Sequence, residues 1–202
     1  NGVIEQVAGG IGNVEHNSIL VRYSNDFSIW DLESVNHYKD QTDIFFTCHE
    51  FSYNKIAEAY EPYLGLIRQM FHKYCSGTLE EFMEECDVYK LQRPVFESYF
   101  EKGFCERTEQ ILIDEVEYEQ ERMRNSIVTM LQKLSEIRPV VIVLNRFQLA
   151  SKSTMQLSNS LLQVKNKNIG IVLGVNDVQS IPEFAHEEWD AICESMDDRN
   201  IC

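Results

Sequence analysis

The sequence predicts an α/β protein with a parallel sheet that is covered by helices on both faces. Four short runs are apolar at nearly every position and rich in β-branched residues, which is typical of strands buried on both sides. Segments with helical periodicity separate these runs, as in successive strand–helix–strand units. We therefore expect a three-layer fold with strands near residues 18–23, 43–48, 140–145 and 168–175.

Size and charge limit the classes of protein to consider. The chain has 202 residues, of which 44% are hydrophobic, so it can form one domain with a substantial core. Its formal net charge of −15 repels phosphate backbones and anionic lipids, so we expect neither nucleic acid nor a membrane as a partner. Since the chain does not begin with Met, we interpret residues 1–202 as a fragment of a longer protein.

The first quarter of the chain predicts one strand–helix–strand unit. Residues 3–8 favour one or two helical turns, and residues 18–23 (SILVRY) favour a short strand. A turn and a helix are expected between residues 24 and 41, before the second buried strand, Thr42–Cys48.

A block of helices follows, and it is too long for a single crossover between strands. Residues 61–75 form an amphipathic pattern, and Thr78 with Glu81 predicts a capping box. A short helix near residues 94–104 and a long one over residues 108–137 complete the block. We therefore predict a helical insertion over residues 61–137.

The last third predicts two strands, each followed by a helix. The strand at residues 140–145 precedes a Ser-rich helix whose apolar face includes Leu157, Leu161 and Val164. The strand at residues 168–175 precedes a final helix, for which Ser180 and Glu183 predict a second capping box.

Polar residues follow each predicted strand, at the edge of the sheet where parallel α/β folds bind ligands. Since Asn, Asp and Ser also favour turns for local reasons, these residues have a purely structural interpretation as well. The residues concerned are Ser24, Asn25 and Asp26, His49 and Glu50, Asn145 and Arg146, and Asn176 and Asp177.

The motifs of phosphoryl transfer are missing from the sequence. A phosphate-binding loop needs the pattern G-x-x-x-x-G-K-[ST], and the chain has no Gly-Lys pair followed by Ser or Thr. Residues 9–13 (GGIGN) contain glycines but no lysine, and no strand is expected before them.

The six cysteines include no C-x-x-C pair, and the chain is large and apolar enough to fold without disulfides. We expect free thiols in a reducing cytoplasm. Cys48 and His49 are adjacent, which leaves a catalytic pair open, although strand alternation points them to opposite faces.

From Thr42 onward the order of motifs resembles the AAA-like STAND signal-transduction ATPases, a P-loop (ASCE) group of large bacterial regulators. The segment RPVVIVLNRFQLASKSTMQLSNSLL, which begins at Arg138, is similar to the family's Walker B strand and Ser-rich helix. NIGIVLGVNDV is similar to the sensor strand, and FFTCHEFSYNKIAEAYEPYLGLIRQMF to the strand and Pro-Tyr helix that follow the phosphate loop. The resemblance implies the ATPase core topology, in which strand one lies beside strand four and strand three lies between strands four and two. The last strand of that core is expected beyond Cys202.

The same resemblance identifies where this chain departs from the family. Asn145 stands at the position of the Mg²⁺-linked acid, Arg146 at that of the second acid, and Asn176 at the sensor position. Ser24 and Asn25 stand where the phosphate loop would begin, without glycine or lysine. Neutral Asn cannot supply a carboxylate's charge to a metal, and Arg146 places a positive charge nearby.

We therefore expect a non-hydrolysing pseudo-ATPase without a cofactor, acting in bacterial signal transduction and transcription regulation. Its expected partners are other protein domains, either of the same regulator or of a signalling protein. Two alternatives remain open: a domain that binds ATP and Mg²⁺ at a non-standard site, with Arg146 pairing a phosphate, and a purely structural or oligomerisation module.

Overall fold

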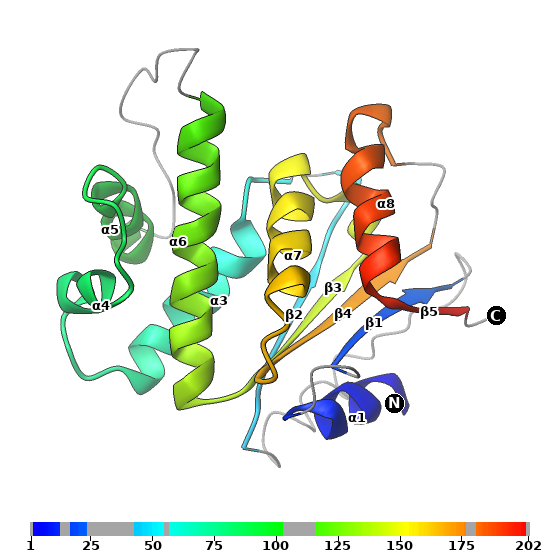
Figure 1. The fold of residues 1–202 in the computed structure, drawn as a ribbon, viewed down its shortest axis with the longest axis horizontal. Coiled ribbons are helices and arrows are strands. Elements are labelled where there is room, and N and C mark those ends of the chain that lie inside the picture. Colours follow the sequence, from blue (N-terminus) through cyan, green and yellow to red (C-terminus); the bar gives the residue numbers. More distant parts are fainter. Residues whose placement is uncertain are drawn as a thin grey trace. The chain divides into compact units, whose positions relative to one another are not determined.

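A five-stranded parallel sheet organises the fold (Figure 1). The structure is a computed structural model and describes residues 2–12, 17–23, 43–54, 57–102, 116–176 and 181–200. The strands lie in the order β2-β3-β4-β1-β5. Their bounds are Ser18–Arg22 (β1), Phe45–Glu50 (β2), Val140–Asn145 (β3), Ile169–Val175 (β4) and Asp197–Asn200 (β5). The predicted α/β class, the parallel pairing and the position of strand one beside strand four are confirmed.

The fifth strand corrects the sequence analysis. We expected the last strand of the sheet beyond Cys202, but Asp197–Asn200 pairs with β1 in parallel. This strand reads DDRN and has no apolar run, so hydropathy gave no signal for it. A strand at the edge of a sheet needs only one neighbour, and charged residues are common there because they discourage further pairing.

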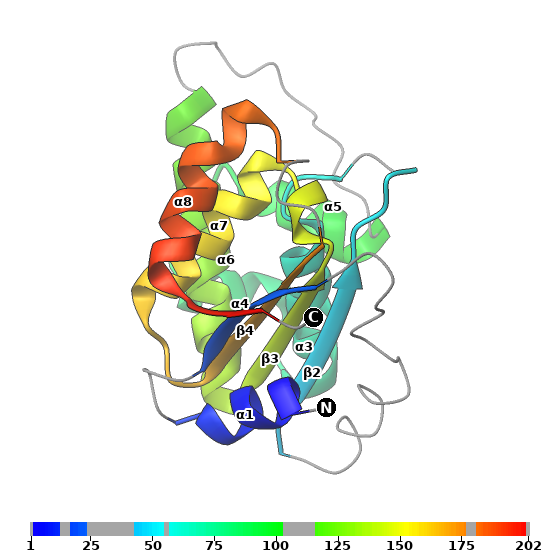
Figure 2. The same ribbon diagram turned by 90° about the vertical axis from the view of Figure 1, so that its right-hand side faces the viewer.

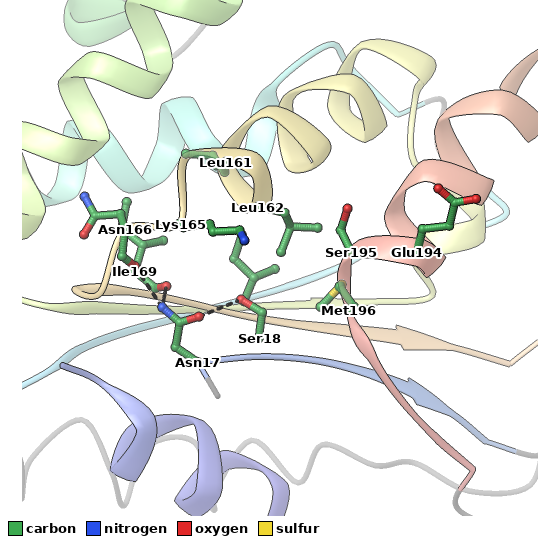
Figure 3. A pocket seen from close by; sticks show the side chains of 11 residues that line it. Asn17, Ser18, Leu161, Leu162, Lys165, Asn166, Ile169, Glu194, Ser195 and Met196 are labelled. Carbon is green, nitrogen blue, oxygen red and sulfur yellow. Dashed lines mark hydrogen bonds between the residues drawn. The ribbon is translucent and has the colours of Figure 1, made fainter. Parts of the chain in front are cut away.

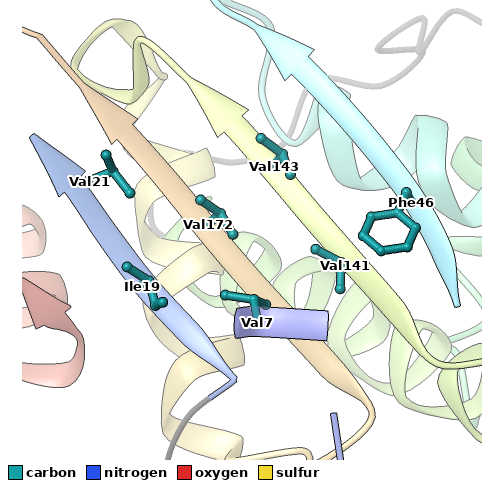
Figure 4. Packing of buried hydrophobic residues seen from close by; sticks show 7 residues of the cluster. All are labelled: Val7, Ile19, Val21, Phe46, Val141, Val143 and Val172. Carbon is teal, nitrogen blue, oxygen red and sulfur yellow. The ribbon is translucent and has the colours of Figure 1, made fainter. Parts of the chain in front are cut away.

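One face of the sheet packs against helix α1 (Gly2–Gly10), which is longer than the turn or two expected over residues 3–8. Alternate residues of four strands point to this face and bury a cluster with Val7 of α1 (Figure 4). The cluster consists of Val7, Ile19, Val21, Phe46, Val141, Val143 and Val172. Gly170 lies beneath α1, where an added Cβ would stand 2.6 Å from Cγ1 of Val7. The close approach of helix and sheet therefore requires glycine at this position.

The other face is covered by α7 (Lys152–Val164) and α8 (His186–Ser195), which lie side by side (Figure 2). Glu188 of α8 joins the two helices. It accepts a 2.9 Å hydrogen bond from Gln156 and pairs with Lys152 at 3.3 Å. Leu157 and Leu161 are buried as predicted, but Val164 is 41% exposed because it lies in the last turn of α7.

The start of the final helix differs from the prediction. A 3-10 turn, η4 (Glu183–Ala185), precedes α8, and no side chain caps either element. The α-helix begins at His186, so Glu183 lies in the 3-10 turn and not in the first turn of α8. The predicted capping box also needs the Ser180 side chain. Ser180 lies outside the described residues.

The chain divides into two compact units, and the second comprises residues Pro62–Ile137. It is built by α3 (Glu61–Tyr74), α4 (Leu79–Glu85), α5 (Arg93–Lys102) and α6 (Val116–Ile137). The ring of Phe71 packs against those of Phe82 and Phe100, with centroids 5.3 and 5.6 Å apart. The capping box of Thr78 and Glu81 is present as predicted.

Some expectations concern residues that the structure does not describe: the helix between residues 24 and 41, residues 108–115 of the long helix, and Cys105 and Cys202. The described cysteines, Cys48, Cys75, Cys86 and Cys193, form no disulfide bond with one another. Among the described residues, no helix is long and apolar enough to span a membrane.

Candidate functional site

The carboxyl edge of the sheet, where β1 to β4 end, gathers Tyr23, Glu50, Asn145, Arg146 and Asn176. Of the five residues that the resemblance assigned to a nucleotide site, this edge brings together Asn145, Arg146 and Asn176. Ser24 and Asn25, like Asp26 and Asp177, lie outside the described residues. His49 and Glu50 are the last two residues of β2 and do not follow it, because β2 pairs with β3 as far as Glu50 and Asn145.

Asn145 ends the buried strand β3 and is only 5% exposed. Its side-chain oxygen Oδ1 accepts two hydrogen bonds, from the Tyr23 hydroxyl at 2.5 Å and from the backbone N–H of Arg146 at 3.0 Å. Its backbone oxygen accepts the N–H of Phe51 at 3.1 Å. Both oxygens of Asn145 are therefore occupied by hydrogen-bond donors of the protein itself.

Tyr23 reaches Asn145 because of the register of the sheet. Ile19 and Val21 face α1, so alternation along the chain also directs Tyr23 to that face, which Val143 and Asn145 share. Burial raises the pKa of the Tyr23 phenol above its usual value, although the charge of Arg146 acts in the opposite direction. The phenol is therefore a proton donor at neutral pH, which matches its bond to an acceptor oxygen.

Arg146 adopts a left-handed backbone conformation, with φ 53° and ψ 45°. This turn takes the chain from β3 into the short 3-10 helix η2 (Phe147–Leu149). The Nε atom of Arg146 lies 3.4 Å from Oε1 of Glu50, and the two side chains are 38% and 52% exposed. The guanidinium thus stays accessible to solvent and is partly neutralised by a carboxylate from the neighbouring strand.

Asn176, which follows β4, is also engaged within the protein. Its Oδ1 atom accepts a hydrogen bond from Nε2 of Gln148, a fully buried residue of η2. Oε1 of the same Gln148 is buried and has no hydrogen-bond partner among the described residues. The amide oxygens that end β3 and β4 are therefore both bound by neighbouring side chains.

The glycines of residues 9–13 lie at the opposite edge of the sheet, where the strands begin, which we call the amino edge. Gly9 and Gly10 end α1, and the N–H of Gly12 donates to the carbonyl of Lys167 at 2.7 Å, just before β4 begins. Gly12 has a φ of 95°, which favours glycine for a turn. These glycines connect α1 to the sheet and do not lie at the carboxyl edge.

A cavity of about 280 Å³ also lies at this amino edge, between the last turns of α7 and α8 (Figure 3). Its lining includes Asn17, Ser18, Lys165 and Ser195, and none of the predicted site residues. Asn17 is buried, and its Nδ2 atom donates to the carbonyls of Asn166 and Ile169, both at 2.8 Å. The polar floor of the cavity therefore holds the chain in place before β4.

The adjacent Cys48 and His49 do not form a pair on one face. Cys48 packs against the cluster beneath α1. The ring of His49 contacts that of Phe51, with centroids 4.7 Å apart. Among the described residues, no group of three or more His, Cys, Asp or Glu side chains could hold a metal ion.

Two residues that bind the asparagines, Tyr23 and Gln148, were not among the site residues predicted from the sequence. The alternation of apolar residues from Ile19 could have placed Tyr23 on the same face as Asn145. Gln148 offered no comparable signal, since it is polar and follows the strand.

No protein-family model matches the chain, and no curated protein matches its sequence.

Proposed function

We propose that the chain is a non-hydrolysing domain of the P-loop (ASCE) type, related to the STAND regulators, that acts through contacts with other proteins. In this proposal the carboxyl edge is a former nucleotide site that now serves the stability of the fold. The partners are other domains of the same regulator or a separate signalling protein, and the setting is cytoplasmic signal transduction.

The main support for the proposal is that the side-chain oxygen of Asn145 is bound by other groups of the protein. An acid at this position would have to turn an oxygen toward Mg²⁺ or toward the hydroxyl of a phosphate loop. Here the Oδ1 atom is held by Tyr23 and by the N–H of Arg146. Asn176, at the sensor position, is bound by Gln148 in the same way.

The topology of the sheet also supports the proposal. The strand order β2-β3-β4-β1, with β3 between β2 and β4, is the order that the resemblance implied. In such a core the phosphate loop follows β1. The residues that follow Arg22 here are YSNDFSIWDLE, without glycine or lysine. The loop, its lysine and the acid are all missing from the sequence. This concerted loss favours a pseudo-ATPase over an active ATPase in which only one residue has been substituted.

Titration calorimetry of the chain with ATP, ADP and GTP, each with Mg²⁺, tests the proposal. We expect no binding in the micromolar range. Charge-assisted contacts contribute about 1.5–3 kcal/mol each, and micromolar affinity corresponds to about 8 kcal/mol. Loss of the lysine, the loop amides and the metal-linked acid together removes most of that free energy.

Arg146 is the basis of the competing function, because its guanidinium is accessible at the carboxyl edge and could pair a phosphate. Micromolar binding that Arg146→Ala abolishes would establish this nucleotide-binding alternative and overturn the proposal. Tyr53→Phe, which changes an exposed residue, is the matched control.

Two variants that restore the missing acids provide a second test of the proposal. Asn145→Asp with Arg146→Asp restores both acids, and adding Tyr23→Phe removes the donor that occupies the first. We expect no ATP turnover from the double or the triple variant, since neither supplies a phosphate loop. Turnover by either variant would mean that a loop exists elsewhere in the chain.

A further inference from the structure

Tyr60 has a backbone conformation that a bulky side chain rarely adopts. Its φ is 62°, in the left-handed region. Asp87 and Lys165 are also left-handed, but both are exposed residues that follow a helix, where this conformation is common. Tyr60 instead precedes a helix, α3, and its side chain is only 6% exposed.

The hydroxyl of Tyr60 adds a second unfavourable feature. It is buried and has no hydrogen-bond partner among the described residues. Buried polar groups are almost always paired, and an unpaired hydroxyl loses the hydrogen bonds that water would give it. A strained backbone and an unpaired polar group therefore coincide at one residue.

A side chain of α7 holds the backbone of Tyr60 in this state. The N–H of Tyr60 donates to Oγ1 of Thr154 at 3.2 Å. Thr154 is fully buried in the first turn of α7, where its Oγ1 also lies 2.9 Å from the hydroxyl of Ser151, the N-cap residue. The beginning of α7 thus fixes the conformation of Tyr60.

The location of Tyr60 gives this arrangement a consequence. The chain leaves the first compact unit at Glu61 and enters the helical unit at Pro62. On the other side, α7 follows the short 3-10 helix η2, which begins directly after Arg146 at the carboxyl edge. Tyr60 therefore lies where the chain leaves the first unit, with its backbone bonded to the first turn of α7.

We infer that Tyr60 is a releasable latch at this junction. In the held state its N–H binds Thr154 and its ring is buried. In the released state the backbone leaves the left-handed region, and the hydroxyl reaches water. Strain of this kind favours release, whereas the bond to Thr154 and the burial of the ring oppose it. A change at the start of α7 therefore shifts the balance between the two states.

Hydrogen exchange of the 202-residue chain, followed by mass spectrometry over residues 57–66, tests the latch. Thr154→Val removes the acceptor and should accelerate exchange there about tenfold, while Thr154→Ser keeps the hydroxyl and stays within about twofold. Tyr60→Phe removes the unpaired hydroxyl and should slow exchange about threefold. Lys165→Gly, at an exposed left-handed residue, should leave these residues unchanged.

Two results would overturn the inference. The first is unchanged exchange over residues 57–66 in Thr154→Val. The second is unchanged or faster exchange in Tyr60→Phe, which would show that the unpaired hydroxyl does not destabilise the held state. If Thr154→Val also lost protection in β3 and β4, so that the whole fold had opened, Tyr60→Phe would decide alone: slower exchange supports the latch, and unchanged or faster exchange rejects it.

Discussion

One buried asparagine lies at the edge where the strands begin, the amino edge, and another lies at the edge where they end, the carboxyl edge. The first uses its amide nitrogen and the second its amide oxygen. At the amino edge, Nδ2 of Asn17 donates to two carbonyls that precede or begin β4. At the carboxyl edge, Oδ1 of Asn145 accepts from Tyr23 and from the backbone of Arg146. The amino edge thus satisfies backbone acceptors, while the carboxyl edge occupies an oxygen that a metal-binding residue would need free.

The surroundings of the two asparagines differ as well. The amino edge is tightly packed, with Gly170 beneath Val7. The carboxyl edge carries an accessible ion pair between Arg146 and Glu50. We conclude that changes at the amino edge should cost more stability, because packed backbone cannot relax as easily as exposed side chains.

The largest effect is expected at Gly170. A Cβ there would lie 2.6 Å from Cγ1 of Val7 and 3.0 Å from the backbone oxygen of Asn17. Gly170→Ala should therefore lower the free energy of unfolding by about 2–3 kcal/mol, as overpacking of cores does. Urea denaturation measures this change.

Two variants control for the presence of a methyl group itself. Gly9→Ala adds a Cβ in α1 with nothing within 4 Å, and should stabilise the protein by about 0.5–1 kcal/mol. Val7→Ala in the Gly170→Ala background should recover part of the loss. If Gly170→Ala alone were neutral, the close approach of α1 would be wrong.

Asn17→Ala should have the next largest effect. It removes two hydrogen bonds to carbonyls at the start of β4, for a loss of about 2 kcal/mol at about 1 kcal/mol each. Thermal and urea unfolding both report this change. Ser18→Ala, which removes only a 3.4 Å bond to Asn17, is the control and should cost less than about 0.5 kcal/mol. Equal losses in the two variants would contradict the bracing role of Asn17.

Tyr23→Phe tests the carboxyl edge and should lower the free energy of unfolding by about 1 kcal/mol, since Asn145 keeps its bond to Arg146.

The raised pKa of Tyr23 adds a pH dependence to the stability of the protein. A group whose pKa is higher in the folded state contributes stability that is complete below its unfolded value, 10.0, and is lost as pH rises through the folded value. The wild-type chain should therefore lose this contribution above about pH 10, and the Phe variant should not.

The control for the pH dependence is Tyr53→Phe, because Tyr53 is 62% exposed. It should leave the alkaline limb of the stability curve as it is in the wild-type chain. If the alkaline limb were identical in Tyr23→Phe and the wild type, Tyr23 would not be the cause of the stability loss at high pH.

Glu50→Gln should have the smallest effect, below about 0.5 kcal/mol. The ion pair with Arg146 is exposed to solvent and spans 3.4 Å, and such pairs contribute little. Urea unfolding at low and high salt checks this, and the small difference should shrink further with salt. A loss above about 2 kcal/mol would show that the carboxyl edge is as tightly built as the amino edge.

Much of the sheet was predictable because buried parallel strands have an unmistakable composition. VVIVLN of β3 was predicted residue for residue, and β4 to within one residue. The helices α3 and α7 were predicted from their periodicity, and a short helix was expected near α5. Strand β5 was not predictable, because a polar strand at an edge is defined only by the neighbour with which it pairs.

The candidate site was predictable as a location but not as an arrangement. The positions of Asn145, Arg146 and Asn176 followed from where strands end. The hydrogen bond between Tyr23 and Asn145 joins residues 122 positions apart, so it depends on the register of β1, β4 and β3 together.

The sequence by itself determined the α/β class, the segments that form the buried strands and the lack of a phosphate-loop motif. These depend on composition, periodicity and local spacing, which any short stretch of chain carries with it. The tertiary structure alone decided how the polar groups are used: that Tyr23 and Gln148 bind the two asparagines, that Gly170 admits α1, and that Tyr60 is held by Thr154. Those outcomes depend on which distant residues the packing brings within hydrogen-bond distance, and no local pattern encodes that distance.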